Sequence, residues 1–300
     1  MNMTLRTLFL VTMIGLVSPL AGQSVLAAPL EIASCSTITA EIANAVGGDK
    51  VLVNELLKPG VDPHTFEPTP SDLIALGNAR LILASGKHME TYSAKLKDAA
   101  ARGAILLAVG DTFPSLKMKD EDSGTGAIIE DPHWWHSVAN MKLATNAVRD
   151  ALEKIDPTDK AAFEANTEAY QKKLDALKAW AQSKIAEFPR DQRKLVTSHD
   201  AFQYFSRAFG FTVYPIEGVS TQDEPSSKKV AEIIQTIKQA HVKAVFFESI
   251  ENPKVLQEIT RESGATIGGE LYADGLGTGD AATYEGMFRH NVNTIVNALK

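Results

Sequence analysis

The chain of 300 residues contains a single cysteine, Cys35. One cysteine cannot form an internal disulfide, so the fold does not depend on disulfide bridges even in an oxidising compartment. We interpret Cys35 as a small buried residue at the end of a strand.

Runs of basic residues, low-complexity tracts and short repeats are also missing. The chain has 30 Lys and Arg against 37 Asp and Glu, which gives a net charge of −7. An acidic chain without basic runs argues against nucleic acid or an anionic membrane surface as a partner, and it is compatible with a cationic ligand.

No apolar run reaches the roughly 20 residues that a membrane span requires. Residues 8–20 form a shorter apolar stretch, which follows Arg6 and precedes small residues that end in SVLAAP. This order predicts a secretory signal peptide at residues 1–28, with cleavage after Ala27 or Ala28. No cysteine follows the small residues, so we expect a soluble periplasmic product without a lipid anchor.

Short β-rich apolar stretches alternate with amphipathic stretches along the rest of the chain. We expect strands at residues 30–34, 80–86, 104–110, 194–199, 211–216, 243–249 and 266–272. We expect helices between them, such as residues 37–46, 71–76, 228–240 and 253–263. This alternation is typical of parallel sheets with crossover helices.

One long helical pattern interrupts the alternation. It opens with Asp156 as a predicted N-cap and Pro157 at the first helical position, and Pro189 closes it. About 30 helical residues would extend ~45 Å, which is enough to span two domains. The predicted α/β fold therefore has a parallel sheet in each of two lobes, joined by one long rigid helix. The predicted limits are residues 29–152, 153–188 and 189–300.

The sequence has no compact metal motif such as HExxH, but it places histidines where ligands gather. The tripeptide Asp-Pro-His occurs twice and ends in His64 and His133, and the proline restricts the backbone at both places. His199 and Asp274 each follow a predicted strand, and ligands bind beyond the carboxyl ends of parallel strands. Three imidazoles and one carboxylate, two groups from each lobe, favour tetrahedral Zn²⁺ without excluding Mn²⁺.

Four acidic residues lie near these predicted ligands. Asp62 and Asp131 precede the two Pro-His pairs, either as acceptors for the imidazole N–H groups or as local caps. For Glu67 and Glu248 we expect hydrogen bonds between the lobes or contacts that orient ligands.

The sequence allows more than one role for some of the other histidines. His136 is either an alternative ligand or part of a packed wall with the neighbouring tryptophans. His88 belongs either to a second metal site or to a plain loop. We interpret His241 and His290 as surface groups. The polar stretch at residues 217–229 is either a lid over the site or a surface loop.

Four segments of the chain together resemble the metal-binding solute receptors of ABC importers. In chain order they are PGVDPHTFEPTPSDL, EDPHWWHSV, VTSHDAFQYFSRAFGF and LYADGLG. The resemblance covers essentially the whole chain after the signal. It implies two lobes joined by a rigid helix, no catalysis, and metal ligands at His64, His133, His199 and Asp274. Many manganese members carry Glu where His199 stands, so the resemblance favours zinc. Many zinc members also carry a His-rich loop, which residues 112–131 lack, so the chain resembles the zinc branch without that loop.

We therefore expect a monomeric periplasmic receptor that captures Zn²⁺ and delivers it to an inner-membrane ABC permease. A periplasmic zinc metallochaperone is a further expected partner. The alternatives are a manganese or iron receptor of the same family, a zinc hydrolase with an open position for water, and a receptor for a metal chelate or vitamin.

Overall fold

The computed structural model describes residues 28–119, 126–221, 225–248 and 253–300. The predicted signal peptide, apart from Ala28, lies outside these ranges. Across the described residues, none of the helices combines the length and the apolar character that a membrane span requires.

Four parallel strands form the first sheet, in the order β2-β1-β3-β4. They are β1 (Leu30–Ser34), β2 (Val51–Glu55), β3 (Leu81–Ala84) and β4 (Ile105–Ala108). The predicted strands that correspond to β1, β3 and β4 are confirmed, and β2 was missed. β2 is an edge strand in which Leu52 is 48% exposed, so its sequence does not form the continuous buried run that marks a central parallel strand.

Two helices of this lobe begin at clear capping signals. The Ser36 hydroxyl accepts a hydrogen bond from Thr39 N at the start of α1 (Thr37–Gly47). Thr69 and Asp72 form a reciprocal capping box at the start of α2 (Pro70–Asn78), which α3 (Ser93–Ala99) follows in the chain. The capping box fixes where the loop that carries His64, between β2 and α2, must end.

A second sheet of four parallel strands has the order β10-β9-β7-β8. Its strands are β7 (Lys194–Thr197), β8 (Thr212–Pro215), β9 (Ala244–Glu248) and β10 (Thr266–Leu271), as predicted to within a few residues. The helices of this part are α6 (Gln203–Phe209), α7 (Ser227–Ala240), α8 (Pro253–Ser263) and α9 (Tyr284–Leu299). In this sheet β7 and β9 are neighbours although β8 lies between them in the chain, so the carboxyl ends of β7 and β9 form a switch point where ligands bind.

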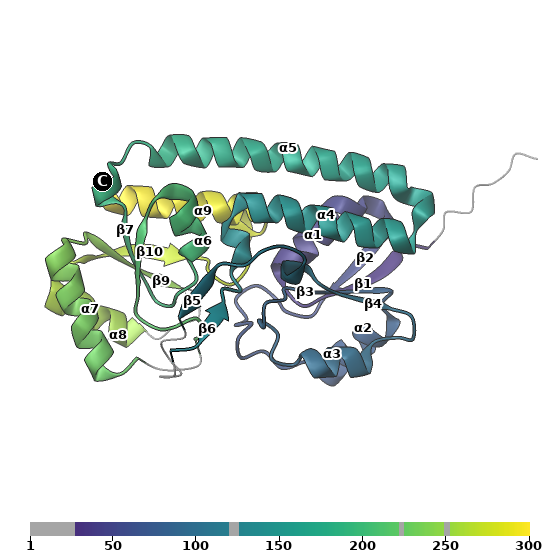
Figure 1. The fold of residues 1–300 in the computed structure, drawn as a ribbon, viewed down its shortest axis with the longest axis horizontal. Helices are drawn as coiled ribbons and strands as arrows, with labels where there is room; N and C mark the ends of the chain where they lie inside the picture. The colour runs from purple at the N-terminus through teal and green to yellow at the C-terminus, as the bar shows by residue number, and fades with distance from the viewer. Residues whose placement is uncertain (1–27, 120–125, 222–224, 249–252) are drawn as a thin grey trace, which may run out of the picture.

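The long helix α5 (Lys160–Ile185) has 26 residues and a length of ~39 Å. It runs above both sheets in Figure 1 and packs against α1, α4 (Val138–Ile155) and α9. Its buried side chains follow the predicted helical spacing: Phe163, Tyr170, Leu174, Leu177, Ala181 and Ile185. The predicted cap Asp156 instead accepts a hydrogen bond from Thr158 N and caps a short 3-10 turn, Pro157–Asp159, just before the helix. Because one apolar core extends from Ile32 in β1 to Leu299 in α9, the helix holds the two lobes together.

An antiparallel hairpin that the sequence did not predict links the first sheet to α4. Its strands are β5 (Lys117–Lys119) and β6 (Ile128–Glu130), in the segment where the resemblance placed a His-rich loop. A 3-10 turn, Trp134–His136, begins after the Asp-Pro-His tripeptide that follows β6. The hairpin and the turn bring His133 to the space between the sheets. The predicted domain limits stay a prediction.

Candidate metal centre

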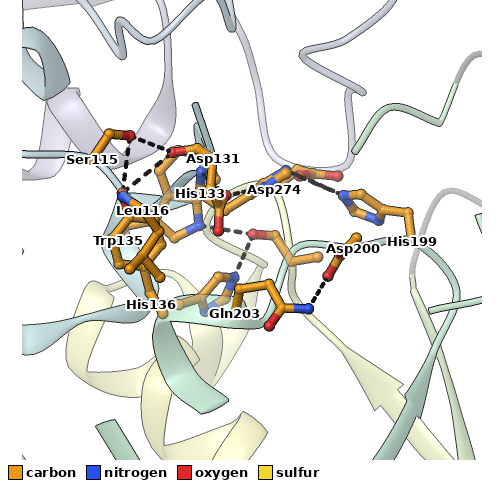
Figure 2. Close-up of polar contacts among 12 residues, drawn as sticks. Ser115, Leu116, Asp131, His133, Trp135, His136, His199, Asp200, Gln203 and Asp274 are labelled. Carbon is orange, nitrogen blue, oxygen red and sulfur yellow. Dashed lines mark hydrogen bonds and ion pairs between the residues drawn. The ribbon is translucent and has the colours of Figure 1, made fainter. Parts of the chain in front are cut away.

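Four side chains from distant parts of the chain meet between the two sheets. His64 lies in the loop after β2, His133 precedes the turn Trp134–His136, His199 follows β7 and Asp274 follows β10. One donor atom from each of the four lies within 4.8 Å of the donor atoms of the other three. Figure 2 shows the His133 and His199 rings facing the Asp274 carboxylate.

Five of the six distances between these donors are those of a tetrahedral metal site. His133 Nε2 lies 3.4 Å from His64 Nε2 and 3.3 Å from His199 Nε2. Asp274 Oδ1 lies 3.3 Å from Nε2 of both His133 and His199, and 3.6 Å from His64 Nε2. In a tetrahedron the ligands are separated by about 1.63 times the metal–ligand distance, so zinc ligands at about 2.0–2.2 Å lie about 3.3–3.6 Å apart.

Two carboxylates fix the orientation of two of the imidazoles. Asp131 Oδ1 accepts hydrogen bonds from both Nδ1 and the backbone N of His133, each at 2.9 Å. Glu248, the last residue of β9, accepts a hydrogen bond from His199 Nδ1. A carboxylate is an acceptor only, so the Nδ1 atoms carry the protons and each neutral ring presents the Nε2 lone pair to the centre. Asp131 thus takes both roles considered from the sequence, and Glu248 orients a ring.

The other two acidic residues have different roles. Asp62 Oδ1 accepts a hydrogen bond from the His64 backbone N at 2.8 Å, as a cap does. Asp62 Oδ2 accepts one from the Thr221 hydroxyl at 2.6 Å, which joins the two lobes beside the site. Thr221 belongs to the polar stretch at residues 217–229, interpreted above as either a lid or a surface loop, of which residues 222–224 lie outside the described ranges. Glu67 pairs with Lys95 on the surface and is 61% exposed, so the cleft role expected for Glu67 is wrong.

Burial makes this cluster of donors costly without a cation. The His133 and His199 side chains are fully buried, and both oxygens of Asp274 are buried without a hydrogen-bond donor among the described residues. Lone pairs and a carboxylate oxygen that face one another out of water repel, unless a metal ion or protons lie between them.

The pKa shifts of these groups also indicate that the buried donors need a cation or protons between them. Burial lowers the pKa of His133, but its contacts with Asp131 and Asp274 outweigh burial and raise the pKa overall. Burial also lowers the pKa of His199, but the charges of Glu248 and Asp274 bring it well above its usual value. Burial raises the pKa of Asp274, and the adjacent histidines then hold it well below its usual value. The site therefore binds protons when it binds no metal.

We expect Asp131→Asn to lower the affinity for Zn²⁺ by about 10–100-fold, the usual effect of altering a carboxylate that orients a ligating imidazole. The amide keeps the size of the side chain but removes the charge beside His133. Isothermal titration measures the change. Asp111→Asn is the matched control, because Asp111 also caps a backbone N–H, that of Lys87 at 2.7 Å, and is not one of the four clustered residues. Equal affinities in the two variants would contradict the orienting role.

The remaining histidines do not join this cluster in the described part of the chain. His136 is buried in the wall and donates its Nε2 hydrogen to Ala273 O at 2.8 Å, and burial lowers its pKa to about 3. His88 and His241 are exposed. His290 is half-buried and donates to Glu270 O at 3.0 Å, so it lies at the surface but is held by a hydrogen bond.

Two lobes with parallel sheets, a long helix across both, and a buried cluster of three histidines and one aspartate define a class of protein, the metal-binding substrate-binding proteins of ABC importers. Members of this class are not enzymes, so the zinc hydrolase alternative is wrong. Residues 32–298 match the family described as zinc-uptake complex component A, periplasmic (ZnuA), and the chain belongs to this family.

Known relatives cover nearly the whole chain. It is 37% identical over 279 residues to the zinc-binding protein TroA of Treponema pallidum (strain Nichols), which covers 90% of this chain and 89% of TroA. It is 34% identical over 278 residues to the manganese-binding lipoprotein MntA of Bacillus subtilis (strain 168), which covers 90% of both. The solved structure of the periplasmic zinc-binding protein TroA from Treponema pallidum matches with a TM-score of 0.83 and 35% identity, over 90% of this chain and 99% of that chain. The relatives differ in metal, and one is named a lipoprotein, so family membership fixes neither the metal nor the anchoring.

Proposed function

We propose that this protein captures Zn²⁺ in the periplasm with His64, His133, His199 and Asp274 and delivers it to an ABC permease in the inner membrane. The observation that carries the proposal is the set of four buried donors at tetrahedral spacing, three of them imidazole nitrogens. Zinc takes this mixture of nitrogen and oxygen ligands in this geometry. The similarity to TroA, which is named for zinc, supports the same metal.

A manganese or iron receptor is the second candidate, and the name of MntA supports it. Manganese prefers more carboxylate ligands and a higher coordination number. The cluster contains one carboxylate, Asp274, and the nearby Glu248 is engaged with His199. The ligand set therefore favours zinc.

A receptor for a chelate or vitamin finds little support in the space beside the site. The cavity that Asp274 and Glu248 line, against the loop from Leu57 to Val61, has a volume of about 20 Å³. A cavity of that size holds about one water molecule. The space beside the four donors therefore offers no room for the organic part of a chelate.

The test is the metal content of the full chain, purified from the periplasm without added metal or chelator. We expect one zinc per chain by mass spectrometry under native conditions and by elemental analysis. In an equimolar mixture of Zn²⁺ and Mn²⁺, we expect the metal-free protein to retain zinc. Manganese or iron at one ion per chain in both experiments would instead identify the protein as a manganese or iron receptor. No bound metal in either would overturn the receptor role itself.

Export and partners follow from the same proposal. Residues 1–28 direct export, and the mature protein is a soluble monomer, in contrast to the lipoprotein MntA. The sole cysteine, Cys35, is 1% exposed after β1, which supports a structural role for it rather than lipid attachment. A metallochaperone that hands over zinc would compensate for the absence of histidine from residues 112–131.

A further inference from the structure

One backbone carbonyl beside the site receives two hydrogen bonds from the opposite lobe. Ala273 O accepts the indole Nε1–H of Trp135 at 2.7 Å and the imidazole Nε2–H of His136 at 2.8 Å. Both donors follow His133 in the chain, and Ala273 directly precedes Asp274. Two of the four clustered side chains, one from each lobe, are thus connected through a single peptide group. Figure 2 shows Trp135 and His136 on the stretch that follows His133.

The segment on the other side of Asp274 is also held by the first lobe. Leu276 N donates to the hydroxyl of Thr37, the first residue of α1, at 2.8 Å. A Cβ on Gly275 would lie 2.7 Å from the same hydroxyl oxygen, so the backbone approaches α1 more closely than a side chain would allow. The peptide that carries Asp274 is therefore fixed on both sides by groups from the N-terminal lobe.

The two donors are themselves firmly placed. Trp135 is 1% exposed, its ring packs edge-on against His133 at 5.5 Å, and its carbonyl accepts a hydrogen bond from Tyr284 at 2.7 Å. His136 is 1% exposed and its ring lies 4.4 Å from that of Phe202. Buried donors on a packed turn hold their acceptor with little freedom, as a rigid binding site requires.

We propose that Trp135 and His136 act as positioning residues, which hold Asp274 at the distance from His133 that a tetrahedral ion requires and so contribute to the preference for zinc over manganese. This inference rests on the proposed metal site and deepens it. A carboxylate on a fixed backbone donates one oxygen at a fixed place. Manganese gains from a carboxylate that can shift and from extra ligands. Loosening the peptide should therefore weaken zinc binding more than manganese binding.

Trp135→Phe and Trp134→Phe form a matched pair for the test. Both tryptophans are buried, and each donates one indole hydrogen bond to a carbonyl, Trp134 to Ser85 O at 3.0 Å. Only the bond from Trp135 reaches the peptide before Asp274. The zinc and manganese affinities of the full chain are measured for both variants by competition with a chelator, and thermal unfolding of the metal-free forms is recorded.

We expect similar losses of thermal stability in the two variants, because each loses one buried hydrogen bond. We expect Trp135→Phe to lower the zinc affinity about tenfold or more, the lower end of the range for groups that support a ligand, and the manganese affinity by less than about threefold. Trp134→Phe should leave the ratio of the two affinities unchanged. The same ratio in both variants would overturn the inference.

Substitution of His136 gives an independent measurement. His136→Leu removes the second hydrogen bond and should lower the zinc-to-manganese affinity ratio in the same direction. His136→Gln keeps an N–H donor and should restore part of the ratio. Equal ratios for His136→Leu and the unchanged protein would count against the inference. If the unchanged protein bound neither metal, the proposed function would fail instead, so the two failures are distinguishable.

Discussion

His199→Ala is expected to remove zinc binding at any concentration that is useful for uptake. Altering a carboxylate that supports a ligand lowers affinity about 10–100-fold, and deletion of a ligand itself should exceed the upper end of that range. The substitution leaves three donors, and it leaves the buried Glu248 carboxylate without the ring it binds. An unpaired buried charge destabilises a fold, so the double variant His199→Ala, Glu248→Gln separates loss of folding from loss of binding.

Chelator competition and metal analysis measure this effect. Both the single and the double variant should lose zinc, and the double variant should keep the circular dichroism of the unchanged protein. His241→Asn is the control, since His241 is exposed at the left-handed end of α7, a position that Asn also favours. Zinc affinity that survived in the double variant within about tenfold would show that His199 is not a ligand.

The affinity for zinc is expected to fall steeply as the pH decreases. The metal needs neutral imidazoles, so each protonated ring must release its proton before the metal binds. The pKa values of His133 and His199 are raised by their carboxylate neighbours, so competition by protons begins above the usual histidine value of about 6.5. Between pH 8 and pH 6 we expect a loss of about 100-fold or more, because more than one ring gains a proton in that interval.

Isothermal titration at pH 8, 7 and 6 in buffers of different ionisation enthalpy measures both the affinity and the protons released. Glu248→Gln provides the comparison, because removal of that charge lowers the pKa of His199. The variant should bind zinc more weakly at pH 8 and lose less affinity between pH 8 and pH 6. An affinity that stayed flat over this range would contradict the set of three histidines.

The same pKa shifts give the metal-free protein an opposite dependence on pH. A histidine whose pKa is higher in the folded state than in the unfolded state stabilises the fold below the unfolded pKa, and this contribution is lost as the pH rises through the folded pKa. For His133 and His199 it is fully present below about 6.5, and it declines from there as the pH rises toward and through their raised pKa values in the folded protein. The increase in Tm on adding zinc should therefore grow from pH 6 to pH 8.

Local sequence patterns predicted most of the fold. The apolar strands that lie inside a sheet were recognised because both of their faces are buried, as in β3, where all four residues are buried. The long helix was recognised from its apolar spacing and from Pro157 and Pro189 at its ends. The edge strand β2 was missed although the edge strands β4, β8 and β10 were recognised, because β2 ends in the polar residues Asn54 and Glu55. The strands β5 and β6 were missed because three residues carry no distinctive pattern.

The partners of the acidic residues could be predicted from the sequence only where the partner is a near neighbour in the chain. Asp131 stands beside His133 in the chain, so its hydrogen bond to that ring could be anticipated. Asp62 stands in the same relation to His64 but accepts from the backbone N and from Thr221, a partner that no local pattern indicates. Glu67 was expected near the cleft, yet Lys95, far away in the sequence, pairs with it on the surface.

The sequence by itself determined the α/β class, the spanning helix and the candidate donors, because strand burial, helical spacing and residues at strand ends are local properties of the chain. Only the tertiary structure decided how close the donors lie and which carboxylate orients which ring. It also decided that Trp135 and His136 donate hydrogen bonds to the peptide before Asp274. These relations join residues of different lobes through contacts of about 3 Å, and such distances depend on how α5 and the shared core dock the two sheets together.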